Sequence, residues 1–179
     1  MPELMKWTIS LLVVVFLSGC MNDPSKRTPG VFIDDAVLEP MVRSEIRKSD
    51  KGFKGSHLAI VSYNGVVLIA GQVATDELRG KASAAAQNLQ RVRKVHNELT
   101  VGGPISLVAR TNDSWLTTKV KTRLLASSQA YGTKVKVVTE NGVVYMLGLI
   151  TRSQADIAVD VASEVYGVQK IVKVFEYLD

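Results

Sequence analysis

Residues 63–73 read YNGVVLIAGQV and residues 140–150 read ENGVVYMLGLI, so one pattern occurs twice and aligns without a gap. In both copies an Asn-Gly pair separates two stretches rich in β-branched residues. Asn and Gly tolerate the positive φ angles of a two-residue type I′ turn, so each copy predicts a β-hairpin. The expected strands are residues 58–63, 66–70, 135–139 and 143–147. A repeat of this kind indicates a duplicated structural module.

An amphipathic helix is predicted before each hairpin, because apolar residues recur there at helical spacing. The apolar positions are Leu38, Val42 and Ile46 in the first copy and Leu116, Val120 and Leu124 in the second. Asp35 and Asp113 lie near the expected starts of these helices. A carboxylate at that position can accept hydrogen bonds from free backbone N–H groups and complement the helix dipole, so we expect both to cap their helices.

A second helix and a short strand complete each copy. The helices are expected at about residues 76–91 and 153–165, and the closing strands at 95–101 and 171–177. The order α-β-β-α-β, found twice, predicts an α+β protein. We expect the first domain at residues 32–101, a linker with the sequence Gly102-Gly103-Pro104 at 102–110, and the second domain at 111–179.

The N-terminal twenty residues differ from the rest in composition. Lys6 precedes an uncharged run at residues 7–19, and the only cysteine, Cys20, follows. The run is shorter than the roughly 20 apolar residues that span a bilayer. It has the layout of a secretory signal peptide, with a cationic start, an apolar centre and small residues before the cleavage site. Translation can begin at Met1 or at Met5.

The sequence Leu17-Ser18-Gly19-Cys20 resembles the lipobox of bacterial lipoproteins. It predicts a signal peptide at residues 1–19, acylation of Cys20, and a tether at 20–31. By resemblance to the sorting pattern of enteric lipoproteins, Met21 rather than Asp after the cysteine implies the outer membrane. The alternative is an ordinary signal peptide with a chance cysteine.

Further motifs connect the repeat to a known family. Residues 92–95 (VRKV) and 168–171 (VQKI) each lead into a closing strand, and the second copy contains NDSWLTTKV at 112–120 and TENGVVYMLGL at 139–149. These motifs resemble the BON domain, and more narrowly the dual-BON outer-membrane lipoproteins. The resemblance implies two tandem BON domains, each with a small three-stranded mixed sheet packed against two helices.

The same resemblance implies a function. Members of this family bind anionic phospholipid through the second BON domain, support outer-membrane integrity and are found in part at the division site. We therefore expect a lipid-anchored protein on the periplasmic face of the outer membrane.

The residues of the helix before the second hairpin give a physical basis for a lipid-binding face. Trp115 lies off the apolar stripe that the sheet should bury, with Lys121 and Arg123 towards the edges of its face. An indole with threonines and cations around it suits the interface of a bilayer with anionic head groups. The predicted lipid-binding residues are Trp115, Thr118, Lys119, Thr122, Arg123 and Leu125.

Trp115 has an alternative role, which is to pack against the first domain or against residues 105–109. The first copy provides a comparison, since Val37 stands where Trp115 stands in the second. Any lipid contact is therefore expected in the second domain alone.

Motifs for catalysis or metal binding are missing from the sequence. His57 and His96 lack acidic or cysteine partners at metal-ligand spacing, and the pairs Asp34-Asp35 and Asp76-Glu77 fall near predicted helix starts. We expect no enzymatic activity, metal, cofactor or small-molecule substrate. The formal net charge of +5 favours anionic partners, but the export signal argues against nucleic acid.

Two other functions compete with lipid binding. In the first, the protein is a periplasmic adaptor that docks envelope proteins of outer-membrane assembly or cell-wall remodelling, with Trp115 as a protein hot spot. In the second, it is an osmotic-stress protein that binds or stabilises other periplasmic proteins.

Overall fold

Both Asn-Gly sequences form the predicted hairpins in the computed structural model, which describes residues 28–179. Strands β1 (His57–Tyr63) and β2 (Val66–Val73) pair antiparallel in the first domain, as do β4 (Val135–Glu140) and β5 (Val143–Ile150) in the second. Both central turn residues have positive φ, at 54° and 73° in the first turn and 50° and 73° in the second. These angles are those of a type I′ turn.

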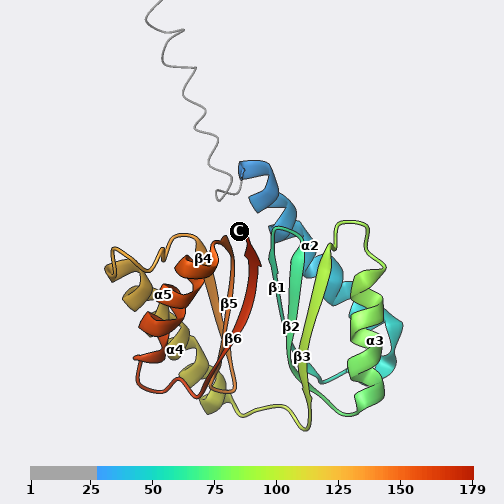
Figure 1. Cartoon of the computed structure of the whole chain (residues 1–179). Helices are drawn as coiled ribbons and strands as arrows, with labels where there is room; N and C mark the ends of the chain where they lie inside the picture. Colours follow the sequence, from blue (N-terminus) through green and yellow to red (C-terminus); the bar gives the residue numbers. More distant parts are fainter. Residues whose placement is uncertain (1–27) are drawn as a thin grey trace, which may run out of the picture.

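The remaining elements complete α-β-β-α-β in each domain (Figure 1). The first domain contains α2 (Pro29–Ser49), a short 3₁₀ turn at Lys51–Phe53, α3 (Asp76–Gln87) and β3 (Lys94–Val101); the second contains α4 (Leu107–Ala126), α5 (Arg152–Ser163) and β6 (Lys170–Tyr177). In each sheet the closing strand pairs in parallel with the second hairpin strand, giving the orders β1-β2-β3 and β4-β5-β6. The predicted α+β fold with two small mixed sheets is confirmed.

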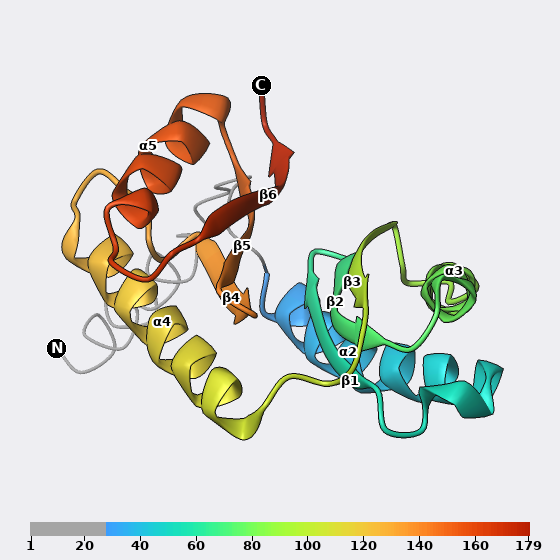
Figure 2. The same cartoon turned by 90° about the horizontal axis from the view of Figure 1, so that it is seen from below.

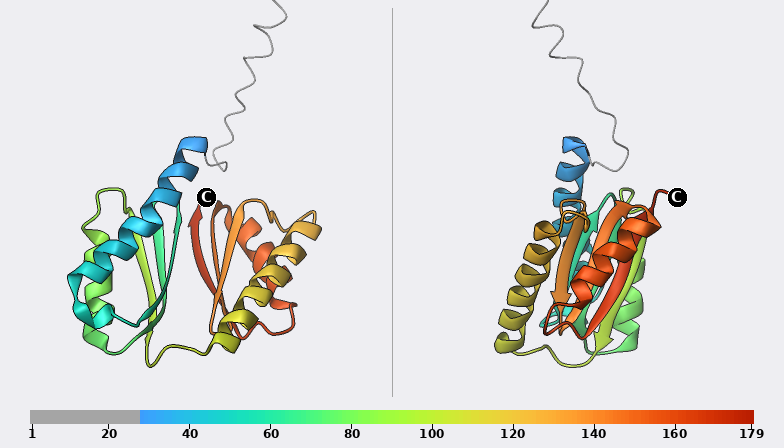
Figure 3. Two further views of the ribbon diagram at one scale, coloured as in Figure 1. Left: turned by 180° about the vertical axis from the view of Figure 1, so that it is seen from behind. Right: turned by 60° about the vertical axis from the view of Figure 1, so that its left-hand side comes forward.

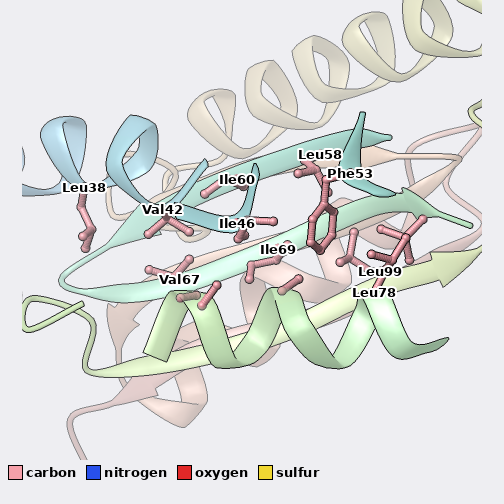
Figure 4. Close-up of a cluster of buried hydrophobic side chains, with 14 residues drawn as sticks. Leu38, Val42, Ile46, Phe53, Leu58, Ile60, Val67, Ile69, Leu78 and Leu99 are labelled. Atoms are coloured by element: carbon pink, nitrogen blue, oxygen red, sulfur yellow. The ribbon is translucent and has the colours of Figure 1, made fainter. Parts of the chain in front are cut away.

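One face of each sheet is covered by the two helices of its own domain. In the first domain, Leu38, Val42 and Ile46 of α2 pack over Val67 and Ile69 of β2 (Figure 4). In the second, the matching stripe of α4 packs over Val144 and Met146 of β5. Both predicted apolar stripes are therefore buried in the core of their own domain.

The other faces of the two sheets pack against each other, so the molecule has four layers with helices on the outside (Figure 1). Leu68 and Ala70 of β2 and Tyr145 and Leu147 of β5 belong to this shared cluster. Every residue of β2 is buried as a result. The linker between the domains runs along one end and is short, because α4 already begins at Leu107.

At the edges of the interface between the sheets, equivalent residues of the two copies make polar contacts. The Tyr63 hydroxyl donates to the carbonyl of Lys134 at 3.0 Å, and at the equivalent place Glu140 Oε2 lies 3.2 Å from His57 Nε2. Lys136 adds an ion pair to Glu39 at 2.7 Å. These contacts fix the register of one domain against the other.

Asp35 and Asp113 do not cap helices, so that prediction was wrong. Both are buried inside α2 and α4, whose N-caps are Thr28 and Ser106. Asp35 instead accepts hydrogen bonds from the turn amides of Asn64 (2.7 Å) and Gly65 (3.0 Å). Asp113 binds the second Asn-Gly turn in the same way, at 2.7 and 2.9 Å. Each carboxylate thus joins its helix to the hairpin turn.

The helices also begin earlier than expected. The start of α2 at Pro29 falls in the segment assigned to the tether, and that of α4 at Leu107 falls in the expected linker. Thr28 and Ser106 supply the capping hydroxyls, each accepting from the backbone N–H three residues on. The expected signal peptide, Cys20 and the tether up to residue 27 lie outside the described residues.

Replacing the buried carboxylate should destabilise the protein. In Asp35→Asn one acceptor oxygen becomes an amide that faces a backbone N–H, so we expect a loss of about 1–3 kcal/mol in the free energy of unfolding. Asp34→Asn is the matched control, since Asp34 is exposed and pairs with Arg91 on the surface; its expected cost is below about 1 kcal/mol. Urea unfolding measures both, and equal losses would contradict this role for Asp35.

The sheet interface should weaken in alkali through Tyr145. Burial, followed by the nearby carboxylates of Glu98 and Glu140, raises the pKa of Tyr145 from 10.0 to about 12. The folded state therefore holds the phenol proton more tightly than the unfolded chain. Its contribution to stability is complete below about pH 10 and is lost as the pH rises towards 12. As the pH rises from about 9 to about 11, the free energy of unfolding measured in urea should fall less for Tyr145→Phe than for the native protein. The exposed-site variant Tyr166→Phe should behave as native, and identical slopes for all three proteins would refute the prediction.

Candidate lipid-binding site

Helix α4 faces the sheet with one side and solvent with the other. Leu116, Val120 and Leu124 are buried against the sheet, as the sequence predicted. Seen from below, α4 lies on the outside of its sheet, away from the first domain (Figure 2). The outer side exposes large apolar side chains, namely Leu107, Val108, Trp115 and Leu125.

The six predicted lipid-binding residues all lie outside the core. Trp115 is 61% exposed and Leu125 is 53% exposed. Lys119 is half-buried, and its ammonium stands 3.5 Å from the centroid of the Trp115 ring, a cation–π contact. Thr118, Thr122 and Arg123 are exposed further along the helix. A ring this exposed is not enclosed by the first domain or by residues 105–109.

The other cations of α4 are engaged within the protein. Lys121, expected near the edge of the lipid face, donates to the carbonyls of Gly132 (2.7 Å) and Val135. Arg123 lies 3.3 Å from Glu164, with both side chains in solvent. An exposed pair of this kind is weak and can exchange for another anion. Of the cations predicted to bind lipid, Lys119 and Arg123 therefore both remain available to a ligand.

A cleft of about 290 Å³ opens beside Trp115 and Lys119. Its walls are the outer part of α4, the turn at Asn141 and Gly142, and the loop between α5 and β6. Tyr166, in that loop, is 91% exposed and belongs to the lining. Sequence analysis missed Tyr166. The available signal was the repeat itself, because Gln90-Arg91 in the first copy becomes Tyr166-Gly167 in the second.

The two histidines lie near the interface of the sheets. His57 contacts Glu140, and burial, together with the charge of Lys94, lowers the pKa of His96. Within residues 28–179 no three His, Cys, Asp or Glu side chains are grouped so that they could hold a metal ion. The same part of the chain has no helix long and apolar enough to cross a membrane.

The repeated fold agrees with comparison to known proteins. Residues 34–103 and 112–179 each match the BON domain family. The chain belongs to the BON-domain family. Those two matches cover most of its length, and the predicted resemblance is confirmed.

Individual proteins of known sequence are also similar to this chain. The outer membrane lipoprotein DolP of Haemophilus influenzae is 40% identical over 193 residues, covering 100% of this chain and 99% of that protein. The 21 kDa hemolysin of Actinobacillus pleuropneumoniae is 38% identical over 85% of this chain and 78% of its own. The osmotically-inducible protein Y of Escherichia coli is 27% identical, covering 86% and 78%.

The BON-domain protein described here is thus an envelope lipoprotein, anchored by lipid in the outer membrane. Its predicted localisation is confirmed. Acylation of Cys20 concerns a residue outside the described range and stays a prediction.

Truncating Trp115 should leave the fold intact. Because most of its ring is in solvent, we expect Trp115→Ala to change the free energy of unfolding by less than about 0.5 kcal/mol. The adjacent Leu116 is buried, and Leu116→Ala should cost about 2–5 kcal/mol. Urea unfolding of both variants separates the two roles. A large loss for Trp115→Ala would mean that Trp115 is a structural residue.

Proposed function

We propose that this protein is a non-enzymatic outer-membrane lipoprotein that binds anionic phospholipid through α4 of its second BON domain. Binding supports outer-membrane integrity, including at the division site. The observation that carries the proposal is the outer side of α4, where Trp115, Leu107, Val108 and Leu125 are exposed beside Lys119 and Arg123.

This surface combines the two features that a bilayer interface selects. Tryptophan prefers the depth of the head groups, and apolar neighbours can enter the upper acyl region. Each Lys or Arg near an anionic surface contributes about 1 kcal/mol, and salt screens this attraction. With two cations and one indole, the affinity of the isolated domain is expected to be modest.

The anchor makes a modest affinity sufficient. From Cys20 to Thr28 the chain can span at most about 28 Å, a distance similar to the length of about 30 Å of α4 itself. The helix that follows this segment, α2, belongs to the opposite outer layer, but both α2 and α4 face the viewer in the left view of Figure 3. Once Cys20 is acylated, contact of α4 with the bilayer becomes in effect intramolecular.

Vesicle binding tests the proposal directly. A fragment from residue 21 onward contains the whole described fold, with both helix-covered cores closed inside it. We expect it to cosediment with vesicles of phosphatidylglycerol and phosphatidylcholine, to bind pure phosphatidylcholine at least tenfold more weakly, and to dissociate as salt rises. Trp115→Ala should reduce binding by about tenfold or more at unchanged stability.

Val37→Ala provides the matched control, since Val37 occupies the position of Trp115 in the first domain and should not affect binding. Absence of binding to either vesicle would overturn the proposal and leave the adaptor function, in which the same surface docks an envelope protein.

A further inference from the structure

The cleft beside Trp115 contains two exposed aromatic rings and one cation. Trp115 on α4 and Tyr166 on the loop between α5 and β6 both line it. The Lys119 ammonium lies 3.5 Å from the ring centroid of Trp115 and 6.0 Å from that of Tyr166. The two rings and the ammonium therefore form one group at the mouth of the cleft.

The available charge in this cleft is positive. Among residues 28–179, Lys119 has no ion pair with a carboxylate, and its ammonium lies over the two rings. Asp113 also lines the cleft, but its oxygens accept the turn amides of Asn141 and Gly142. The remaining polar groups of the lining include the neutral side-chain amides of Asn112, Asn141 and Gln169.

The first domain has a cavity at the equivalent place, of about 320 Å³, with a different lining. There Arg91 pairs with Asp34 at 2.8 Å and Arg93 pairs with Glu176 at 2.9 Å, so a carboxylate stands beside each cation, as it does not beside Lys119. Gln90 stands in place of Tyr166, and α2 carries Val37 and Met41 in place of Trp115 and Lys119. The cavity occurs in both BON domains, whereas the two aromatic rings and a cation without a carboxylate partner occur in the lining of the second alone.

We infer that this cleft receives the phosphate and glycerol of one anionic phospholipid head group, with Tyr166 as a determinant of head-group preference. The inference rests on the proposed function and deepens it. At about 290 Å³ the cleft is at the small end of ligand sites, so it holds a head group while the acyl chains stay in the bilayer. Lys119 binds the phosphate, and the side-chain amides bind glycerol hydroxyls.

The position of Lys119 explains why the preference is for an anionic lipid. Two exposed rings alone would form a site for a quaternary ammonium, as in aromatic cages that bind choline. Here an ammonium of the protein already occupies the ring face and repels a second cation. Choline is therefore excluded by charge, and a head group with net negative charge is favoured.

Tryptophan fluorescence of the fragment from residue 21 onward reports on the cleft. The fragment lacks Trp7, so Trp115 is its one tryptophan. Titration with phosphatidylglycerol vesicles should change the emission, and Tyr166→Ala should weaken this binding by about fivefold. Ile33→Ala removes an exposed apolar side chain from α2 and should leave binding unchanged. An equal loss in Tyr166→Ala and Ile33→Ala, or none in Tyr166→Ala, would overturn the inference.

Lys119→Gln gives the sharper result. It should weaken binding to phosphatidylglycerol by about fivefold, the effect of one cation, while binding to phosphatidylcholine rises. A parallel fall for both lipids would show that Lys119 acts only through general contact, and the cleft would not be a head-group site. Inorganic phosphate and glycerol 1-phosphate are the soluble probes; if inorganic phosphate competes as well as glycerol 1-phosphate, the site binds free anions.

The two proposals fail in different ways. If Trp115→Ala abolishes vesicle binding and Tyr166→Ala does not alter it, the face of α4 binds lipid without the cleft. If the native fragment binds no vesicle, the proposed function itself fails.

Discussion

The packing of one sheet on the other is the constraint on which the rest of the structure depends. Alternate residues of β2 and β5 point to the helices and to the partner sheet, and both sets are apolar. A single copy would leave Leu68 and Ala70, or Tyr145 and Leu147, exposed as a continuous apolar face, which soluble domains avoid. Duplication removes this face by pairing the copies. Because the sheets lie on the inside, the helices of both domains lie outside, and this leaves the outer side of α4 accessible to a ligand (Figure 1).

The local structure could be predicted from sequence because short-range rules decide it. The Asn-Gly turns fix the hairpins, and the spacing of Leu116, Val120 and Leu124 fixes the buried side of α4. The packing of the two sheets follows from a signal that sequence analysis did not use, the lack of polar alternation at residues 66–70. The role of Asp113 could not be read locally, because its partners at 141 and 142 are distant in sequence. An acidic residue near the start of an apolar stripe is typical of a helix N-cap. Here α4 begins six residues earlier, at Leu107, so Asp113 lies inside the helix.

The two domains share their scaffold and differ at their surfaces, and the proposed function rests on that difference. Residues that hold the fold are equivalent in both copies, as with Asp35 and Asp113 at the turns. Residues on the outside of the first helix are not: Trp115 and Lys119 replace Val37 and Met41. After a duplication, the surface residues of one domain can change while the other domain keeps its own. The same helix can therefore serve as a plain structural element in the first domain and as an interface in the second.

The proposed contact of α4 with lipid is weak, and weak binding suits a lipid-anchored protein. With the predicted acylation of Cys20, the chain up to Thr28 would hold the start of α2 within about 28 Å of the bilayer, so strong affinity would add little to attachment. What a weak second contact adds is selectivity, since a small difference in free energy between head groups decides which patch of membrane the domain prefers. A few exposed side chains on α4 and a small cleft are enough for that task. A deep apolar pocket would instead extract lipid, whereas this cleft of about 290 Å³ is at the small end of ligand sites and suits a head group rather than acyl chains.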